Sequence, residues 1–425
     1  MRKVYLRLLP FTFALYLICY LDRANIGFAA LTMNRDLGLS TYVYGLGAGA
    51  FFWGYFLLEV PSNLILERVG ARRWIARIMI TWGIVSGSFA FVSGPISFFT
   101  LRFLLGLAEA GFFPGMILYF TYWFPPHHRA RITAGFMAAI PVAIGVGAPV
   151  STALLELNGV FGLAGWKWLF LAEALPALIL GVCVLFYLTD RPSEASWLTT
   201  EERDWLTDTL AAEKRRVLAE RSITVLQTLI NPRVIALGAI HFAQAGVSVG
   251  MAVFVTLIVK QLGLSNMQTG WLTAVPFVFG TIGILVWGGI SDRMNERKWN
   301  LTLSCLCMAI GLLMAGLFVG TYLSVAGLSI AMIGLYASNA HLFPIPSMFL
   351  TGAAAASGIA WVNSLGILAG GVTSPVMGYL RDATGSYESG LYFLAALAAM
   401  GAIVTVLGVR ETSAKLAPGV ATPAV

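Results

Sequence analysis

Long apolar stretches separated by short polar segments make up most of the chain. A helix needs about 20 apolar residues to cross a bilayer. Backbone groups in lipid must be hydrogen-bonded within their own segment, so uninterrupted stretches of this length predict helices rather than strands. The twelve stretches of sufficient length lie at 8–30, 42–66, 74–93, 95–122, 132–156, 167–189, 233–259, 269–290, 300–320, 324–346, 354–380 and 388–409. The pattern predicts an all-α integral membrane protein with twelve transmembrane helices.

A weak internal repeat divides these spans into two sets of six. An acid followed by several bases stands after the second span and again after the eighth, at Glu67, Arg68, Arg72 and Arg73 and at Asp292 and Arg293. Such repeats are typical of transporters built from two related bundles. We predict two pseudo-symmetric six-helix bundles over residues 1–189 and 233–410. In each copy the charges could latch the bundles together in one state or could only anchor the topology.

The only long polar segment, 190–232, joins the two predicted bundles. Thr199 and Glu202 have the spacing of a capping box, which opens a helix. Bases and Trp205 on this helix indicate that it lies along the inner membrane surface as a tether. The last residues, 411–425, are small and include two prolines, which predicts a disordered tail.

Composition and charge agree with a membrane protein and fix its orientation. Charged residues are 11% of the chain and the mean hydropathy is +0.81, whereas soluble domains carry about 25% charged residues. With a cytoplasmic N-terminus, 21 of the 27 Lys and Arg residues fall on the inner side and four on the outer side. Basic loops face the cytoplasm. We therefore predict that both termini are cytoplasmic, and the net charge of +7 does not indicate nucleic acid binding.

Two adjacent charges in the middle of the first span need an explanation. Asp22 and Arg23 oppose insertion by about 5 to 7 kcal/mol together. At about 100° per residue, Arg23 shares one stripe of the helix with Tyr16 and Tyr20, whereas Asp22 is rotated off it. We interpret this stripe as the wall of a polar cavity, because ionisable groups in membrane segments usually mark solute or ion paths. The alternative is an ion pair of Asp22 that only locks the bundle.

A second charged pair lies in the fourth span. Arg102 and Glu109 are seven residues apart and so lie within about 20° of the same helix face. The predicted direction of the span puts Glu109 level with Asp22 and Arg102 nearer the outside. The proton affinity of a carboxyl group there would change with its neighbours and with access to water, which is what proton coupling requires.

Other polar residues inside the spans give weaker signals. We expect Glu59 and Glu173 to be structural hydrogen-bonding groups. A single polar residue on a membrane helix is usually interhelical glue, and His241, with Gln244 and Ser248 on its stripe, fits that role. For His341 and Asn363, cavity lining is an equally good interpretation. Cys19, Cys183, Cys305 and Cys307 lie within spans, without the partner ligands of a zinc site, so we expect no metal or cofactor.

These motifs together resemble the major facilitator superfamily, and more narrowly its anion:cation symporter family. The resemblance covers nearly the whole chain. Its most specific pieces are Leu21-Asp22-Arg23-Ala24-Asn25-Ile26-Gly27, Glu59-Val60-Pro61-Ser62-Asn63, Arg102-Phe103 with Glu109 to Gly115, Asn363-Ser364, and Asp382-Ala383-Thr384-Gly385-Ser386. The superfamily's loop motif is visible at Glu67 to Arg73 and at Asp292 to Lys298.

The resemblance implies proton-driven uptake of a small organic anion by rocking of two six-helix halves. It implies that Arg23 contacts the carboxylate of the solute and that Asp22 and Glu109 move protons. Tyr20, Tyr55 and Asn363 match positions that line the site. Our hypothesis is a proton symporter for an organic carboxylate in a bacterial inner membrane, in which Arg102 holds the environment of Glu109 and a monomer suffices.

Three other functions compete with this hypothesis. A proton-coupled exporter of cations would use the same acids, but an uncompensated Arg23 repels cations. A membrane sensor would need a larger soluble domain than 190–232 provides. An intramembrane enzyme would need a paired nucleophile and base or a metal set, and no motif of that kind stands out in the sequence.

Overall fold

The structure is a computed structural model that describes residues 1–219, 230–294, 296–342, 345 and 352–409. The described residues are almost entirely helical and contain no strand. The helices are α1 (Arg2–Asp36), α2 (Thr41–Val69), α3 (Ala71–Ser88), α4 (Pro95–Glu109), α5 (Phe112–Thr121), α6 (Pro126–Met137), α7 (Ala139–Leu155), α8 (Gly165–Tyr187), α9 (Thr200–Ala219), α11 (Pro232–Lys260), α12 (Asn266–Met294), α13 (Lys298–Leu317), α14 (Tyr322–Leu342), α15 (Gly352–Thr384) and α16 (Glu388–Gly408), with short 3-10 turns at Phe89–Phe91, Val160–Gly162 and Pro192–Glu194.

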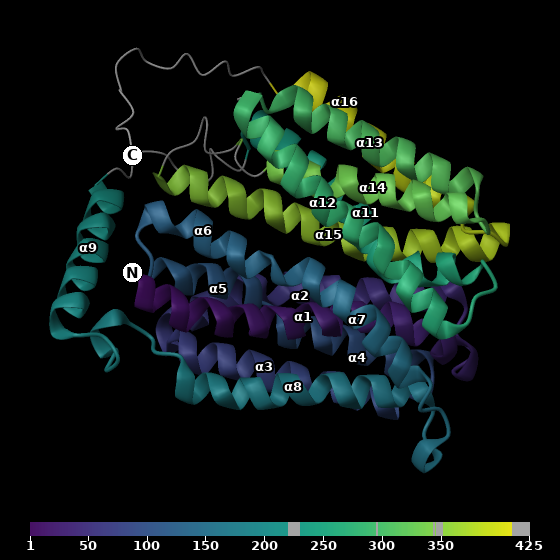
Figure 1. Ribbon diagram of the computed structural model, residues 1–425, viewed down its shortest axis with the longest axis horizontal. Coiled ribbons are helices and arrows are strands. Elements are labelled where there is room, and N and C mark those ends of the chain that lie inside the picture. Colours follow the sequence, from purple (N-terminus) through teal and green to yellow (C-terminus); the bar gives the residue numbers. More distant parts are fainter. Residues whose placement is uncertain (220–229, 295, 343–344, 346–351, 410–425) are drawn as a thin grey trace.

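Twelve spans in the described part of the chain are long and apolar enough to cross a membrane, as the sequence predicts. They run side by side in two groups, α1 to α8 and α11 to α16 (Figure 1). The groups meet where α2 packs on α15, α7 on α12 and α1 on α11. The fold is therefore two six-helix bundles. The predicted tail, 411–425, lies outside the described residues.

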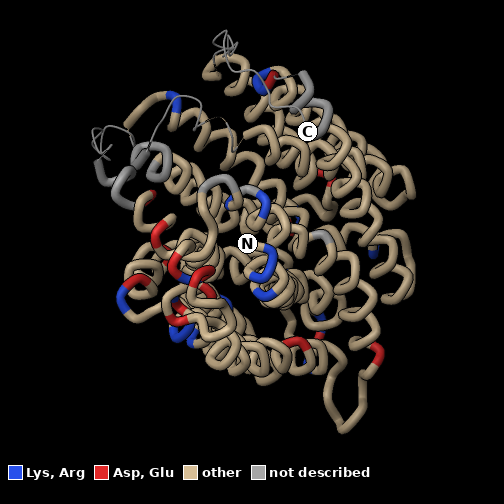
Figure 2. Tube along the Cα trace, turned by 60° about the vertical axis from the view of Figure 1, so that its left-hand side comes forward, with Lys and Arg blue, Asp and Glu red and all other residues tan. Residues whose placement is uncertain are grey.

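Helix α9 lies across one end of the bundles, the end at which Met1 is found (Figure 1). We call this the α9 end. Most of the charged residues gather there (Figure 2). The predicted capping box is confirmed, because the Glu202 amide donates to Thr199 Oγ1 at 3.2 Å and the Thr199 amide donates to Glu202 Oε2 at 3.1 Å. Ion pairs of Lys3 with Glu202 (2.8 Å) and Arg129 with Glu213 (2.7 Å) hold α9 against the first bundle.

Two of the predicted spans are each divided into two helices. Residues 132–156 fall into α6 and α7, which meet at Ala138. Residues 95–122 fall into α4 and α5, because Gly111 has the left-handed φ of 86°. The break frees the carbonyl of Ala110, and Ser62 Oγ on α2 donates to it at 2.8 Å. The break comes directly after Glu109, so it determines where α4 places that carboxyl group.

The break gives a prediction for Gly111→Ala. An alanine in left-handed conformation costs about 1–3 kcal/mol, and its Cβ would lie 2.2 Å from Ser62 Oγ. We expect a clear fall in the apparent melting temperature of the purified protein. The matched control is Gly94→Ala, since Gly94 has extended backbone and nothing within 4 Å of a Cβ. An equal melting temperature for both variants would show that the break tolerates a side chain.

The two bundles are closed against each other at the end opposite α9. Asp382 on α15 accepts hydrogen bonds from the amides of Thr41 (3.2 Å) and Tyr42 (2.7 Å) at the start of α2. Glycines let the backbones approach there, since a Cβ on Gly45 or Gly378 would lie 2.4 Å from a carbonyl oxygen of the other bundle. Small residues allow this close helix packing in membrane proteins. These contacts hold α2 directly against α15 at that end.

The loop motif of the first bundle is bound to its own bundle. The Arg72 amide donates to Asp190 Oδ1 at 2.7 Å, and the same carboxyl group packs on Gly70, whose φ is 98°. Glu67, Arg68 and Arg73 are exposed. Among the described residues, no ion pair joins this motif to the second bundle. The side chains of Asp292 and Arg293 lie outside the described residues, so a latch between the bundles stays a prediction.

Candidate functional site

Arg23 lies on α1 at the interface of the two bundles and is surrounded by aromatic rings. Its guanidinium carbon is 5.5 Å from the ring centroid of Tyr20, 5.6 Å from that of Phe51 and 5.3 Å from that of Tyr55. Such contacts stabilise a cation where water is scarce. The side chain keeps 25% exposure, and its terminal amino groups donate to no described residue. They are therefore available to bind a carboxylate with both nitrogens.

Glu109 is the direct partner of Arg23. The Nε of Arg23 donates to Glu109 Oε1 in a close ion pair, and the thiol of Cys19 donates to the same oxygen at 3.1 Å. Glu109 is fully buried. Its second oxygen, Oε2, is also buried and has no hydrogen-bond partner in the described part of the chain. One carboxyl oxygen of Glu109 is therefore held by two donors and the other by none of the described residues.

Asp22 points away from Arg23 into the first bundle. Ser86 on α3 donates a hydrogen bond to its Oδ1, and the amide of Asn25 donates to the same oxygen at 3.2 Å. The side chain is 1% exposed. The helical rotation expected from the sequence is thus present, but Asp22 does not share one site with Arg23 and Glu109 in this conformation.

Arg102 is buried behind the same aromatic ring. Its guanidinium carbon lies 5.1 Å from the centroid of Phe51, so Phe51 contacts both arginines. The sequence suggested that Arg102 holds the environment of Glu109, yet the direct ion pair of Glu109 is with Arg23. Seven residues of helix, about 10 Å of rise, separate Arg102 from Glu109. Arg102 therefore acts on Glu109 through the electric field and not by contact in this structure.

Tyr16 and His341, both candidates for solute binding, are enclosed. Tyr16 is 3% exposed and stacks on Phe136, with ring centroids 4.1 Å apart, so it supports Tyr20 beside it rather than facing the interface. His341 is fully buried in the second bundle, 6.3 Å from Trp287 between ring centroids. Neither side chain is reachable in this conformation.

Glu59, for which the sequence predicts a structural hydrogen-bonding role, makes such a bond and also lies near Arg23. It lies on α2, 6% exposed, and within electrostatic range of Arg23. The amide of Asn363 on α15 donates to Glu59 Oε1 at 3.3 Å, so this bond joins the two bundles. The sequence contains a local sign that Glu59 lies near Arg23, because Phe51, Tyr55 and Glu59 recur at i, i+4 and i+8 on one face of α2.

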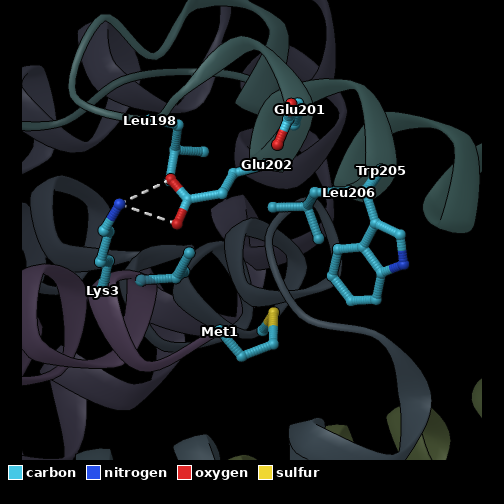
Figure 3. Close-up of a pocket in the computed structure, with 8 residues that line it drawn as sticks. Met1, Lys3, Leu198, Glu201, Glu202, Trp205 and Leu206 are labelled. Carbon is cyan, nitrogen blue, oxygen red and sulfur yellow. Dashed lines mark hydrogen bonds and ion pairs between the residues drawn. The ribbon is translucent and has the colours of Figure 1, made fainter.

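A separate pocket of about 240 Å³ lies at the α9 end, between the start of α1 and α9 (Figure 3). Lys3 reaches across it to both carboxyl oxygens of Glu202 (Figure 3), and this contact lowers the pKa of Glu202. The pocket shares no residue with the Arg23 site. The Lys3–Glu202 contact in this pocket holds α9 against the start of α1. Among the described residues, no three His, Cys, Asp or Glu side chains are arranged to hold a metal ion.

Comparison with known proteins identifies the kind of protein to which this site belongs. The model of the Major Facilitator Superfamily matches residues 12–338 and 237–422. The chain belongs to this superfamily of membrane transporters. This confirms the resemblance found in the sequence, and the solved structure of a D-xylose-proton symporter has the same fold, with a TM-score of 0.75 at 17% identity over 96% of this chain and 98% of that chain.

Two bacterial relatives in the superfamily have informative names. A protein of Agrobacterium vitis named "Putative tartrate transporter" is 51% identical over 413 residues, which is 97% of this chain and 92% of the relative. A protein of Acinetobacter baumannii named "Quinolone resistance transporter" is 40% identical over 406 residues, 95% of this chain and 93% of the relative. The relatives thus include proteins named for an organic acid and for a drug.

Proposed function

We propose that this protein takes up a small organic carboxylate of the tartrate type together with protons, by alternating access. The observation that carries the proposal is the pairing of Arg23 Nε with Glu109, which leaves both terminal amino groups of Arg23 without a partner among the described residues. A carboxylate solute can replace Glu109 as the partner of Arg23 once Glu109 is protonated. The identity of 51% with a relative named for tartrate supports the choice of solute.

Each further residue has a role in this proposal. Tyr20, Tyr55 and Asn363 orient the solute around Arg23. Asp22, held by Ser86 and Asn25, is a second proton-handling acid inside the first bundle, and Arg102 tunes both acids through the field. The solute is moved without chemical change, and one chain carries the complete site.

The orientation and the moving parts are also proposals. The strong excess of Lys and Arg on one side indicates that the α9 end is cytoplasmic, in the inner membrane of a bacterium. The halves 1–189 and 233–410 rock against each other, and the segment 190–232 tethers them. In that orientation the structure is closed on the outer side by Asp382 and the interface glycines.

A competing function is proton-coupled export or exchange of another small solute. The relative named for quinolone resistance favours it, and quinolones carry a carboxylate that Arg23 could also bind. Uptake and export would use the same residues of the site. The two functions differ in how the solute responds to a proton gradient: a symporter moves the solute with the protons, and a proton-coupled exporter moves it against them.

The test is uptake of labelled tartrate into liposomes that contain the purified protein. With an outside-acid gradient we expect accumulation above equilibrium, at least several-fold over protein-free liposomes, and its loss when a protonophore collapses the gradient. Equal accumulation of tartrate with and without the proton gradient would refute proton coupling. Tartrate driven out of the compartment into which protons flow would favour the exporter.

A further inference from the structure

The bond between Glu59 and Asn363 places an acid of the protein where a solute carboxylate would bind. Asn363 Nδ2 donates to Glu59 Oε1 at 3.3 Å, and Glu59 Oε2 is buried without a hydrogen-bond partner among the described residues. The same carboxyl group is within electrostatic range of Arg23. An anion at Arg23 would therefore be within electrostatic range of Glu59, whose other partner is the side-chain amide of Asn363.

The net charge of this site determines how many protons must accompany the solute. Among the described residues, the carboxyl groups that interact with Arg23 on α1 are those of Glu109 on α4 and Glu59 on α2. Arg102 lies behind Phe51 and keeps its own charge throughout. Tyr55 on α2 also contacts Arg23, and Asn363 on α15 bonds to Glu59. Asp22 faces the interior of the first bundle. A dicarboxylate adds two negative charges to this site. The net charge stays constant only if two protons enter with it, one for each carboxyl group of the site.

We infer that Glu59 is a further proton-handling residue, which holds Asn363 in the empty protein and is protonated when a dicarboxylate binds. The inference rests on the proposed function. A proton from water on the open side binds the Glu59 carboxylate. The side-chain amide of Asn363 then donates its hydrogen bond to the solute carboxylate instead of to Glu59. After the solute leaves on the other side, the proton returns to water there, and Glu59 binds Asn363 again.

The variant Glu59→Gln tests this inference, because an amide oxygen can still accept the bond from Asn363 but the side chain cannot ionise. We expect Glu59→Gln to bind tartrate about tenfold more tightly than wild type at pH 8, where the negative charge of Glu59 opposes the anion. We expect the two affinities to converge at pH 5, because the proton that Glu59 must take up on binding is then abundant. The measurement is titration calorimetry across this pH range.

The control is Asp208→Asn, which removes one negative charge from the exposed face of α9 and leaves tartrate affinity at the wild-type value. Equal affinity of Glu59→Gln and wild type at every pH would overturn the inference and leave the proposed function intact. Weaker binding at every pH would also overturn it, since Glu59 would then hold the site in shape. Failure of wild type to bind tartrate at any pH would overturn the proposed function as well.

A second measurement does not depend on the folding of that variant. Calorimetry in buffers of different ionisation enthalpy counts the protons that enter on binding. In Glu109→Gln we still expect proton uptake on tartrate binding at pH 7, because Glu59 remains, and we expect this uptake to fall when Glu59→Gln is added to that variant; unchanged uptake in the double variant would assign the proton to another acid such as Asp22 and overturn the inference. Uptake of no proton by Glu109→Gln, with uptake by wild type, would show that Glu109 is the only proton acceptor of the site.

Discussion

We expect Arg23→Ala to weaken tartrate binding, with a dissociation constant at least about 30-fold higher than that of wild type. In the proposed function the guanidinium is the fixed cation that binds the solute, and removing one partner of a buried charged hydrogen-bonded pair costs about 2–5 kcal/mol, where 1.4 kcal/mol is tenfold in affinity. The aromatic rings of Tyr20, Phe51 and Tyr55 hold the guanidinium in place but cannot replace its charge. Calorimetry on the purified variant measures the effect.

Two further variants show whether the effect is specific to this arginine. Arg23→Lys keeps the charge but loses the two-nitrogen fork, so we expect an intermediate affinity. Arg35→Ala removes an exposed arginine from the last turn of the same helix and leaves binding at the wild-type value. Tartrate binding of wild-type strength by Arg23→Ala would place the solute elsewhere.

Glu109→Gln loses net uptake but retains exchange of tartrate across the membrane. In the empty protein, Arg23 needs the carboxylate of Glu109 as its counter-ion while the bundles rock, because an unpaired charge in this interior is costly. In the proposed cycle, bound tartrate itself neutralises Arg23, so we expect the loaded variant still to change conformation. We expect net uptake to fall at least about 100-fold and the rate of exchange to stay within several-fold of wild type.

The comparison of the two transport modes separates coupling from structure. Uptake into empty liposomes measures net transport, and uptake of labelled tartrate into liposomes preloaded with unlabelled tartrate measures exchange. If net uptake and exchange fell equally, or if neither fell, Glu109 would not be the counter-ion that the empty protein needs. Asp208→Asn again controls for the loss of one negative charge.

The sequence predicted most of the fold and part of the site because both follow from the cost of polarity in lipid. Twelve apolar stretches can only be helices there, and the stripe formed by Tyr20 and Arg23 follows from helical periodicity. The unusual pairs Asp22 with Arg23 and Arg102 with Glu109 indicated which helices carry buried charges, and the structure brings Arg23 of one pair to Glu109 of the other. The capping box of Thr199 and Glu202 is a local motif, so it could be read without any tertiary information.

The features that were missed depend on contacts between distant segments. The break after Glu109 depends on Ser62, which satisfies the free carbonyl of Ala110 from another helix. The choice of Arg23 over Arg102 as the partner of Glu109 depends on how α1 and α4 face each other. Glu59 bonds to Asn363 on the other bundle, more than 300 residues away in the sequence, so this contact could not be predicted from local patterns. The helical spacing of Glu59 with Phe51 and Tyr55 was the one local sign of its position.

The most direct test of the central claim, that a carboxylate and protons enter together through the Arg23 and Glu109 pair, uses liposomes loaded with a pH-sensitive dye and no imposed gradient. Adding tartrate outside should acidify the interior in liposomes with the wild-type protein, and in neither protein-free liposomes nor liposomes with Glu109→Gln. An alkaline shift, or tartrate entry without any change of internal pH, would contradict the account.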